Sequence, residues 1–406
     1  MRTIISNANV LDTGSMTFMG ERTIVIEDGS VVEVSGSHGA TADVVVDAGG
    51  KYVVPGLIDA HVHFRLATLD FRALTAFSEV EFGIIMARLS ADTLRRGFTT
   101  VRDLGGDVSG LIKAIRSGAA DGPRIVRAGL MLTQTGGHGD SDSGPRDVPD
   151  CACQMRHTAF GIVADGVDAV RKGARHLLRD GSDFLKVHVS GGVASPSDPV
   201  DALQYTHDEI NAAVVEAEHR GTYVAAHAYT PEAISQAVRA GVHSIEHGNL
   251  IDEQSARMMA SNGTVLVPTL VTYEGMDRFG KQHNFPQANI LKNKRILEAG
   301  LQSLDIAVKA GVTMGLGTDL IGEVQSMQNN ELAIRAEVQP AVDVLRSMWV
   351  ENPRLCRMEG RIGVIAPGAF GDIVISSVNP LEDITGFSRH ESSITHVLKG
   401  GVVVRG

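Results

Sequence analysis

The middle of the chain alternates short apolar runs with helical stretches, and this alternation restricts the possible folds more than any other feature. Eight runs are expected to be strands: residues 57–64, 99–103, 124–132, 184–189, 223–227, 244–247, 264–270 and 313–318. Residues 208–220 and 231–240 between them are expected to be helices, and the second begins at Pro231 and stops before Gly241. Eight such units in residues 55–362 predict a (β/α)8 TIM barrel, with an open doubly wound sheet as the alternative.

The two ends of the chain resemble each other and differ from the middle. Short strand candidates occur at residues 23–27, 31–34, 372–375 and 402–404. Asp28-Gly29 separates the first two, which predicts a hairpin. Because neither end can form a good core alone, we expect residues 1–54 and 363–406 to combine into one small β-sandwich domain.

Composition excludes some classes of partner and favours one compartment. The 406 residues carry a net charge of −11, whereas a nucleic-acid partner would require a basic face. The chain contains neither the apolar core of a signal peptide nor a run near the ~20 apolar residues that span a bilayer. Cys151, Cys153 and Cys356 are expected to be free thiols, although the first two could bind a metal. We therefore expect a cytoplasmic protein.

Residue types that bind metals stand at the ends of several expected strands. His61 and His63 are one residue apart, so both project from the same face of a strand. Such a pair can share a metal ion or can simply be hydrogen-bonded. Four further groups stand near the ends of other strands: Lys186, His227, His247 and Asp319. Because carboxyl-terminal strand ends meet at a barrel mouth, this convergence favours a metal site.

Lys186 is unusual because it lies inside an apolar strand, where an ammonium group is costly to bury unless it is paired. A salt bridge inside the barrel would explain it. The alternative is carbamylation by carbon dioxide, which requires a neutral amine next to cations. Other polar residues are expected not to bind metal: Arg102 and Asp103 would form a structural ion pair, and His188 would pack or support the metal ligands.

Residues 133–164 form the longest break in the pattern, and a loop of that length in a compact barrel is usually functional. We expect it to cover the catalytic face. It contains His138 between glycines and also Arg156. An arginine can hold a carboxylate through two hydrogen bonds, so Arg156 is a candidate for binding a substrate's terminal carboxylate.

Several motifs together resemble the amidohydrolase superfamily, in particular its metal-dependent dipeptidase branch, which includes barrel-type prolidases. The motifs are PGLIDAHVH at 55–63, TTVRD at 99–103, TGGH at 135–138, Lys186 with SGGVASP at 190–196, HAY at 227–229, EHGN at 246–249, GTD at 317–319 and PG at 367–368 with Asp372. The resemblance covers nearly the whole chain.

The resemblance implies roles for the candidate residues. His61, His63 and Asp319 would bind one divalent metal, His227 and His247 a second, and carbamylated Lys186 would bridge the two; the family usually carries zinc. Metal-activated hydroxide would attack the amide while Asp319 moves the proton to the leaving nitrogen. Tyr229 would stabilise the oxyanion, and His138 would contact the substrate.

The resemblance also implies a substrate class. Many superfamily members carry a histidine just after the last aspartate, whereas here Leu320 and Ile321 follow Asp319, as in the prolidase-like group. We therefore expect a dipeptidase for Xaa-Pro substrates, and the family often forms symmetric homo-oligomers. The alternatives are an Xaa-Arg or Xaa-Lys dipeptidase, an amidase for N-acyl or aryl amino acids such as ochratoxin A, and a barrel that binds metal or ligand without catalysis.

Overall fold

A computed structural model describes residues 1–36, 41–74, 76–140, 156–157, 160–195 and 198–406, without the side chains of residues 71, 72, 156 and 157. The ends contribute the strands β1 (Arg2–Asp12), β2 (Thr17–Glu27), β3 (Ser30–Ser35), β4 (Val44–Asp47), β5 (Tyr52–Pro55), β16 (Ile373–Ser376), β17 (Ile394–Lys399) and β18 (Val402–Arg405). The middle contributes β6 (Leu57–Val62), β7 (Phe98–Asp103), β8 (Arg124–Arg127), β9 (Met131–Thr133), β10 (Arg156–His157), β11 (Gly161–Val163), β12 (Leu185–His188), β13 (Val224–Ala228), β14 (Ser244–His247) and β15 (Val265–Val267).

The helices follow the same order along the chain. The first group is α1 (Phe71–Leu74), α2 (Glu79–Arg95), α3 (Ser109–Arg116), α4 (Val167–Arg179), α5 (His207–His219), α6 (Pro231–Arg239), α7 (Glu253–Asn262), α8 (Leu270–Phe279) and α9 (Gln287–Ala310). The second group is α10 (Asn330–Arg335), α11 (Ala341–Arg346), α12 (Asn352–Leu355), α13 (Ile384–Ser388) and α14 (His390–Ser393), with short 3-10 or π turns η1 (Gly280–His283), η2 (Gly322–Met327) and η3 (Ser347–Glu351). None of the helices in the described ranges is both long and apolar enough to cross a membrane.

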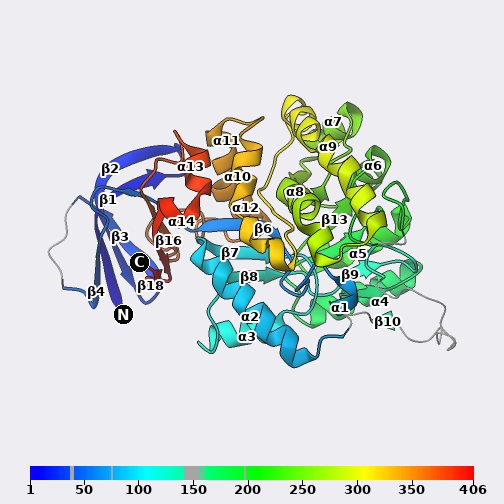
Figure 1. Cartoon of the computed structure of the whole chain (residues 1–406), viewed down its shortest axis with the longest axis horizontal. Helices are drawn as coiled ribbons and strands as arrows, with labels where there is room; N and C mark the ends of the chain where they lie inside the picture. Colours follow the sequence, from blue (N-terminus) through cyan, green and yellow to red (C-terminus); the bar gives the residue numbers. More distant parts are fainter. Residues whose placement is uncertain (37–40, 75, 141–155, 158–159, 196–197) are drawn as a thin grey trace.

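Strands from both chain ends pair in one eight-stranded sheet (Figure 1). Its order is β18-β17-β16-β5-β1-β2-β3, and β4 pairs with β1. The predicted hairpin at Asp28-Gly29 is confirmed, because β2 and β3 are antiparallel and both turn residues have positive φ. A shared core of residues such as Ile5, Val53 and Ile375 joins the two ends.

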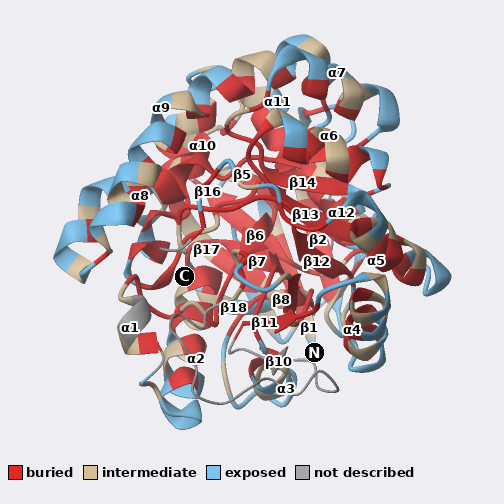
Figure 2. Cartoon of the chain, turned by 90° about the vertical axis from the view of Figure 1, so that its right-hand side faces the viewer, coloured by how far each residue is buried: buried red, intermediate tan, exposed pale blue. Residues whose placement is uncertain are grey.

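The middle of the chain is built on parallel strands surrounded by helices, which confirms the α/β class. One sheet has the order β6-β7-β8, and the other β10-β11-β9-β12-β13-β14-β15. The strands are buried at the centre, and the surrounding helices expose their outer faces (Figure 2). Helices α5 and α6 start and stop within one residue of their predicted ends.

Three predicted strands differ from the structure. The segment 124–132 is not one strand but two, β8 and β9, which belong to different sheets. The strand expected at 264–270 ends at Val267, because α8 begins at Leu270. The segment 313–318 forms only an isolated bridge, between Met314 and Leu266. Its backbone groups form hydrogen bonds with side chains instead of with a neighbouring strand. Arg335 Nη1 donates to the Gly315 carbonyl at 2.7 Å, and the Leu316 amide donates to Asn352 Oδ1 at 3.0 Å.

This segment nevertheless lies between the two parallel sheets. Its Gly315 amide donates to the Leu266 carbonyl on one side, at 2.9 Å. On the other side, the Ala60 amide donates to the Leu316 carbonyl at 2.8 Å. The end of the predicted long loop also differs from expectation, since β11 joins the sheet beside β9.

Glu331 in α10 supports a prediction about stability. Its Oε2 accepts from the Val271 amide at 2.8 Å, and burial raises the pKa of its carboxyl from 4.5 to about 8. The folded protein therefore holds this proton more tightly than the unfolded chain. As a result, the free energy of unfolding falls as the pH rises from 4.5 to about 8. We expect Glu331→Gln to reduce this dependence, measured by urea unfolding at about pH 5 and about pH 8. The control is Glu337→Gln, at an exposed position nearby, which should retain the pH dependence of the wild type. An equal pH dependence in Glu331→Gln and wild type would contradict the prediction.

Candidate active site

A cavity of about 690 Å³ opens at the carboxyl-terminal ends of the central strands. It is lined by eight of the nine residues that the sequence singled out: His61, His63, His138, Lys186, His227, Tyr229, His247 and Asp319. The ninth is Arg156, whose side chain lies outside the described residues, as do Cys151 and Cys153. The structure therefore brings together residues that are up to 258 positions apart in the sequence.

Asp319 lies between His61, which is in β6, and His63, which directly follows that strand. Its Oδ1 is 3.4 Å from His61 Nε2 and 3.3 Å from His63 Nε2. The other nitrogen of each ring faces an acceptor: His61 Nδ1 lies 2.9 Å from Glu246 Oε2, and His63 Nδ1 lies 3.2 Å from the Gly105 carbonyl. Those acceptors place the ring proton on Nδ1, so both Nε2 lone pairs face the carboxylate. Three electron-pair donors facing one another are what a bound cation requires.

The histidines of β13 and β14 complete the floor of the cavity. His227 Nε2 lies 3.1 Å from the Gly191 carbonyl, which leaves Nδ1 as its free lone pair. His247 Nδ1 lies 2.8 Å from Thr269 Oγ1 and 4.0 Å from Asp319 Oδ2. His247 and Asp319 have φ values of 78° and 50°, a left-handed conformation that is uncommon outside glycine and clusters at functional sites.

Lys186 is buried, with 1% of its surface exposed, and its Nζ has no hydrogen-bond partner among the described residues. The salt bridge that would have explained a buried lysine is therefore absent from the part of the chain that the structure describes. Burial lowers the pKa of the Lys186 ammonium and raises the pKa of the Asp319 carboxyl, so both shifts favour the neutral forms. A neutral amine is the form that reacts with carbon dioxide.

Burial also lowers the pKa values of the four histidines at this floor, His61, His63, His227 and His247. After burial, the largest cause of the lowered pKa at both His61 and His63 is the charge of Lys186. The pKa of His63 falls to about 3. Neutral imidazoles have the lone pair that a metal ligand needs. Together with the unpartnered Lys186 Nζ, this donor set suits divalent metals such as zinc.

Arg102 does not pair with Asp103, so that prediction was wrong. Its Nη2 instead donates to Glu246 Oε1 at 2.7 Å, and Glu246 is the acceptor of His61. Asp103 accepts from the Phe64 and Gly105 amides at 3.0 and 3.2 Å, and burial raises its pKa to about 7. Adjacent residues of a strand point to opposite faces, which prevents the expected pair.

Asp59 connects the end of β6, which carries His61, to the segment that leads to Asp319. Its Oδ1 accepts from the amides of His61 and Thr318 at 3.0 and 3.1 Å. Gly317 lies so close that a Cβ there would be 2.8 Å from His61 Cβ. The sequence showed Asp59 and Glu246 only as members of motifs, without revealing these contacts.

Two more cavity residues were not assigned a role from the sequence. Tyr273, on α8, places its hydroxyl 2.8 Å from that of Tyr229 and 3.1 Å from His247 Nδ1. No sequence pattern marked it, because the preceding strand was expected to extend to residue 270. His188, which was expected to pack or to support the metal ligands, lines the cavity, and its Nδ1 has no hydrogen-bond partner among the described residues.

Comparison with known proteins agrees with this arrangement. Ochratoxinase of Aspergillus niger is 29% identical over 365 residues, which cover 87% of this chain and 76% of that protein. The solved structure of a prolidase complexed with N-methylphosphonate-L-proline has a TM-score of 0.94 and 39% identity, covering 100% of both chains. That of a Xaa-Pro dipeptidase with methionine bound in its active site has a TM-score of 0.87 and 28% identity, again covering 100% of both chains.

The family model described as "Amidohydrolase family" matches residues 52–404 of this chain. This match confirms the resemblance drawn from the sequence motifs. The chain therefore belongs to the Amidohydrolase family and is a hydrolytic enzyme.

Proposed function

We propose that this hydrolase uses two divalent metal ions to cleave the amide bond of Xaa-Pro dipeptides. The observation that carries the proposal is the convergence of neutral histidines, Asp319 and the unpartnered Lys186 Nζ in one cavity. The names of two similar structures, a prolidase and a Xaa-Pro dipeptidase, support the substrate class.

In this proposal His61, His63 and Asp319 would hold one metal, His227 and His247 would hold the other, and Lys186, as a carbamate, would be a ligand to both. When bound, zinc-like ions would supply Lewis-acid chemistry, lowering the pKa of water in the site and polarising the scissile carbonyl. Asp319 accepts the proton of the attacking water and passes it to the leaving nitrogen. The Tyr229 hydroxyl donates to the oxyanion, His138 contacts the substrate, and Arg156 is retained as a candidate for the terminal carboxylate.

The same proposal includes the domain arrangement. Residues 55–362 would form a (β/α)8 barrel that closes through the segment 313–319, between β15 and β6. Residues 1–54 and 363–406 would form the separate β-sandwich. The hydrogen bonds of this segment to Leu266 on one side and Ala60 on the other support closure.

A dipeptide panel with zinc and bicarbonate present tests the function. We expect Xaa-Pro substrates to be hydrolysed, activity to disappear after chelation, and about two equivalents of zinc to restore it. Turnover of Xaa-Arg or Xaa-Lys dipeptides without any Xaa-Pro turnover would overturn the substrate class. Absence of hydrolysis of any amide by zinc-reconstituted protein would favour the non-catalytic binding barrel.

The second candidate substrate is an amino acid with a bulky aryl or acyl group on its nitrogen. Similarity to ochratoxinase favours it, as do the apolar side chains that line the cavity: Leu66, Leu74, Met131, Phe160, Met276 and Ile321. Ochratoxin A added to the same panel separates the candidates. Faster cleavage of ochratoxin A than of every Xaa-Pro dipeptide would make the second candidate the primary activity.

Tyr229 provides a direct test of oxyanion stabilisation. Its side chain is buried, and its ring stacks on that of His247 at a centroid distance of 5.2 Å. We expect Tyr229→Phe to lower kcat by about 10²–10³-fold, with little change in KM, because one oxyanion donor is lost. Steady-state kinetics on the best substrate measures both constants. Tyr52→Phe in the terminal sheet is the control, and a kcat within about twofold of wild type for Tyr229→Phe would refute this role.

A further inference from the structure

The ring of His138 is held on three sides. It stacks on His227 with a centroid distance of 4.5 Å and an interplanar angle of 20°. On another side lies Gly192, where a Cβ would be only 2.2 Å from the ring. On the third side, His138 Nδ1 lies 3.3 Å from Asp198 Oδ2, which is within ion-pair distance although the pair lacks the angles of a hydrogen bond. Asp198 is buried, with only 3% of its surface exposed.

Asp198 also fixes the backbone around His138. Its Oδ2 accepts from the Gly192 amide at 3.0 Å and from Gln204 Nε2 at 3.1 Å. Gln204 Oε1 in turn accepts from the His138 amide at 2.9 Å. One buried carboxylate therefore connects the ring of His138, the backbone of His138 and the glycine against which the ring packs.

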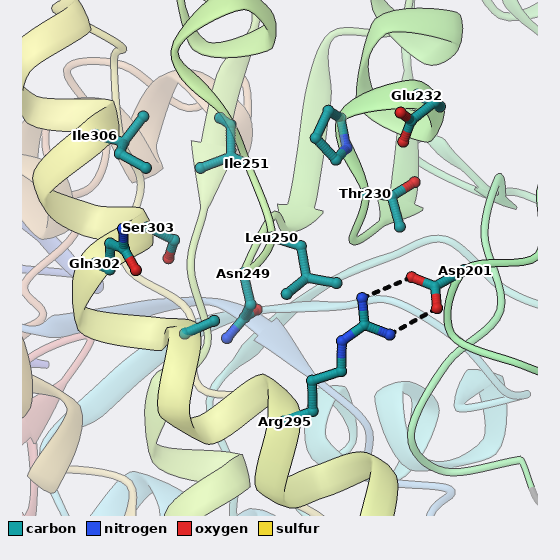
Figure 3. A pocket seen from close by; sticks show the side chains of 12 residues that line it. Asp201, Thr230, Glu232, Asn249, Leu250, Ile251, Arg295, Gln302, Ser303 and Ile306 are labelled. Atoms are coloured by element: carbon teal, nitrogen blue, oxygen red, sulfur yellow. Dashed lines mark hydrogen bonds and ion pairs between the residues drawn. The ribbon is translucent and has the colours of Figure 1, made fainter.

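Helix α9 anchors the segments that carry these groups, residues 190–195 and 198–204. Asn289 Nδ2 donates to the Ala194 carbonyl at 2.7 Å, and Lys292 Nζ donates to the Ser195 carbonyl at 2.7 Å. Arg295 forms two hydrogen bonds with Asp201, at 2.6 and 2.9 Å, beside a second cavity of about 390 Å³ (Figure 3). These three side chains are spaced by three residues, so they share one face of the helix.

We propose that Asp198 is a positioning residue, which holds the His138 ring over the cavity floor with its proton on Nδ1 and its Nε2 directed at the substrate. The charge of Asp198 acts through His138 and does not itself contact the substrate. This inference rests on the proposed contact of His138 with the substrate.

A double-mutant cycle of Asp198→Asn with His138→Asn tests the proposal, using metal-loaded protein. Asparagine keeps an acceptor for the Gly192 amide but removes the charge. We expect Asp198→Asn to lower kcat about 10–100-fold at nearly constant KM and zinc content, as for other carboxylates that orient functional histidines. In the His138→Asn background the same change should have less than about a threefold effect. Asp168→Asn, exposed in the first turn of α4, is the matched control.

A readout independent of activity is the ¹⁵N spectrum of the histidine rings, with His138 assigned from the His138→Asn variant. We expect the proton on Nδ1 in the wild type and a shift towards Nε2 in Asp198→Asn at the same pH. An unchanged tautomer in Asp198→Asn would overturn the proposal even if no substrate is turned over. Equal effects of Asp198→Asn in both backgrounds would also overturn it. If no substrate of the amide panel were hydrolysed but the tautomer shifted as expected, the proposed function would be overturned. The positioning of His138 by Asp198 would still stand.

Discussion

Lys186→Met is expected to abolish amide hydrolysis while stabilising the metal-free protein. The buried Nζ has no partner among the described residues, and an unsatisfied buried donor costs about 1–3 kcal/mol. Methionine fills similar space without a polar group, so the free energy of unfolding should rise by about that amount. Amide hydrolysis should be lost, because methionine cannot form the carbamate that is proposed as a ligand to both metals.

Urea unfolding of chelator-treated protein and steady-state kinetics of zinc-loaded protein provide the two measurements. Lys172→Met, at an exposed position of α4, is the matched control and should change neither quantity. A Lys186→Met variant that retained wild-type kcat in the presence of bicarbonate would contradict the bridging role. A less stable metal-free variant would contradict the account of the buried amine.

Asp319→Asn is expected to lower kcat by about 10²–10⁴-fold, the range for loss of a positioned acid–base group. The amide keeps the shape of the carboxylate but cannot accept the proton of the attacking water. It also weakens the site that Asp319 shares with His61 and His63, so zinc content should fall from about two equivalents towards one.

Atomic absorption and single-turnover kinetics separate these two effects. Asp305→Asn, on the surface of α9, is the control with the same chemical change. If Asp319→Asn bound two zinc ions and retained wild-type kcat, Asp319 would be neither the base nor a metal ligand.

The sequence predicted the elements that local patterns specify. Alternating apolar runs located most of the central strands, and Pro231 and Gly241 bounded one helix to within a residue. The cavity residues could be predicted because parallel strands bring their ends to the same side. Eight residues from distant parts of the chain therefore line one cavity.

The sequence could not predict contacts made by partners far along the chain. The end of β15 depends on α8, whose Val271 amide donates to Glu331, 60 positions later. The partner of Arg102 is Glu246, 144 positions later, whereas the adjacent Asp103 points the other way. The role proposed for Asp198 could not be predicted either. Asp198 belongs to none of the motifs, and His138, through which it acts, lies 60 positions earlier in the chain.

The pairing of β5 with β16 has a consequence for synthesis of the protein. Pro55 lies opposite Ile373 in this antiparallel pair. The ribosome must add about 320 residues between them, which takes about 15–60 s at roughly 5–20 residues per second. During that time the apolar edge of β5 remains without its neighbour, and such an edge is a template for intermolecular pairing. Nascent chains therefore expose this edge of β5 to intermolecular pairing until translation is nearly complete.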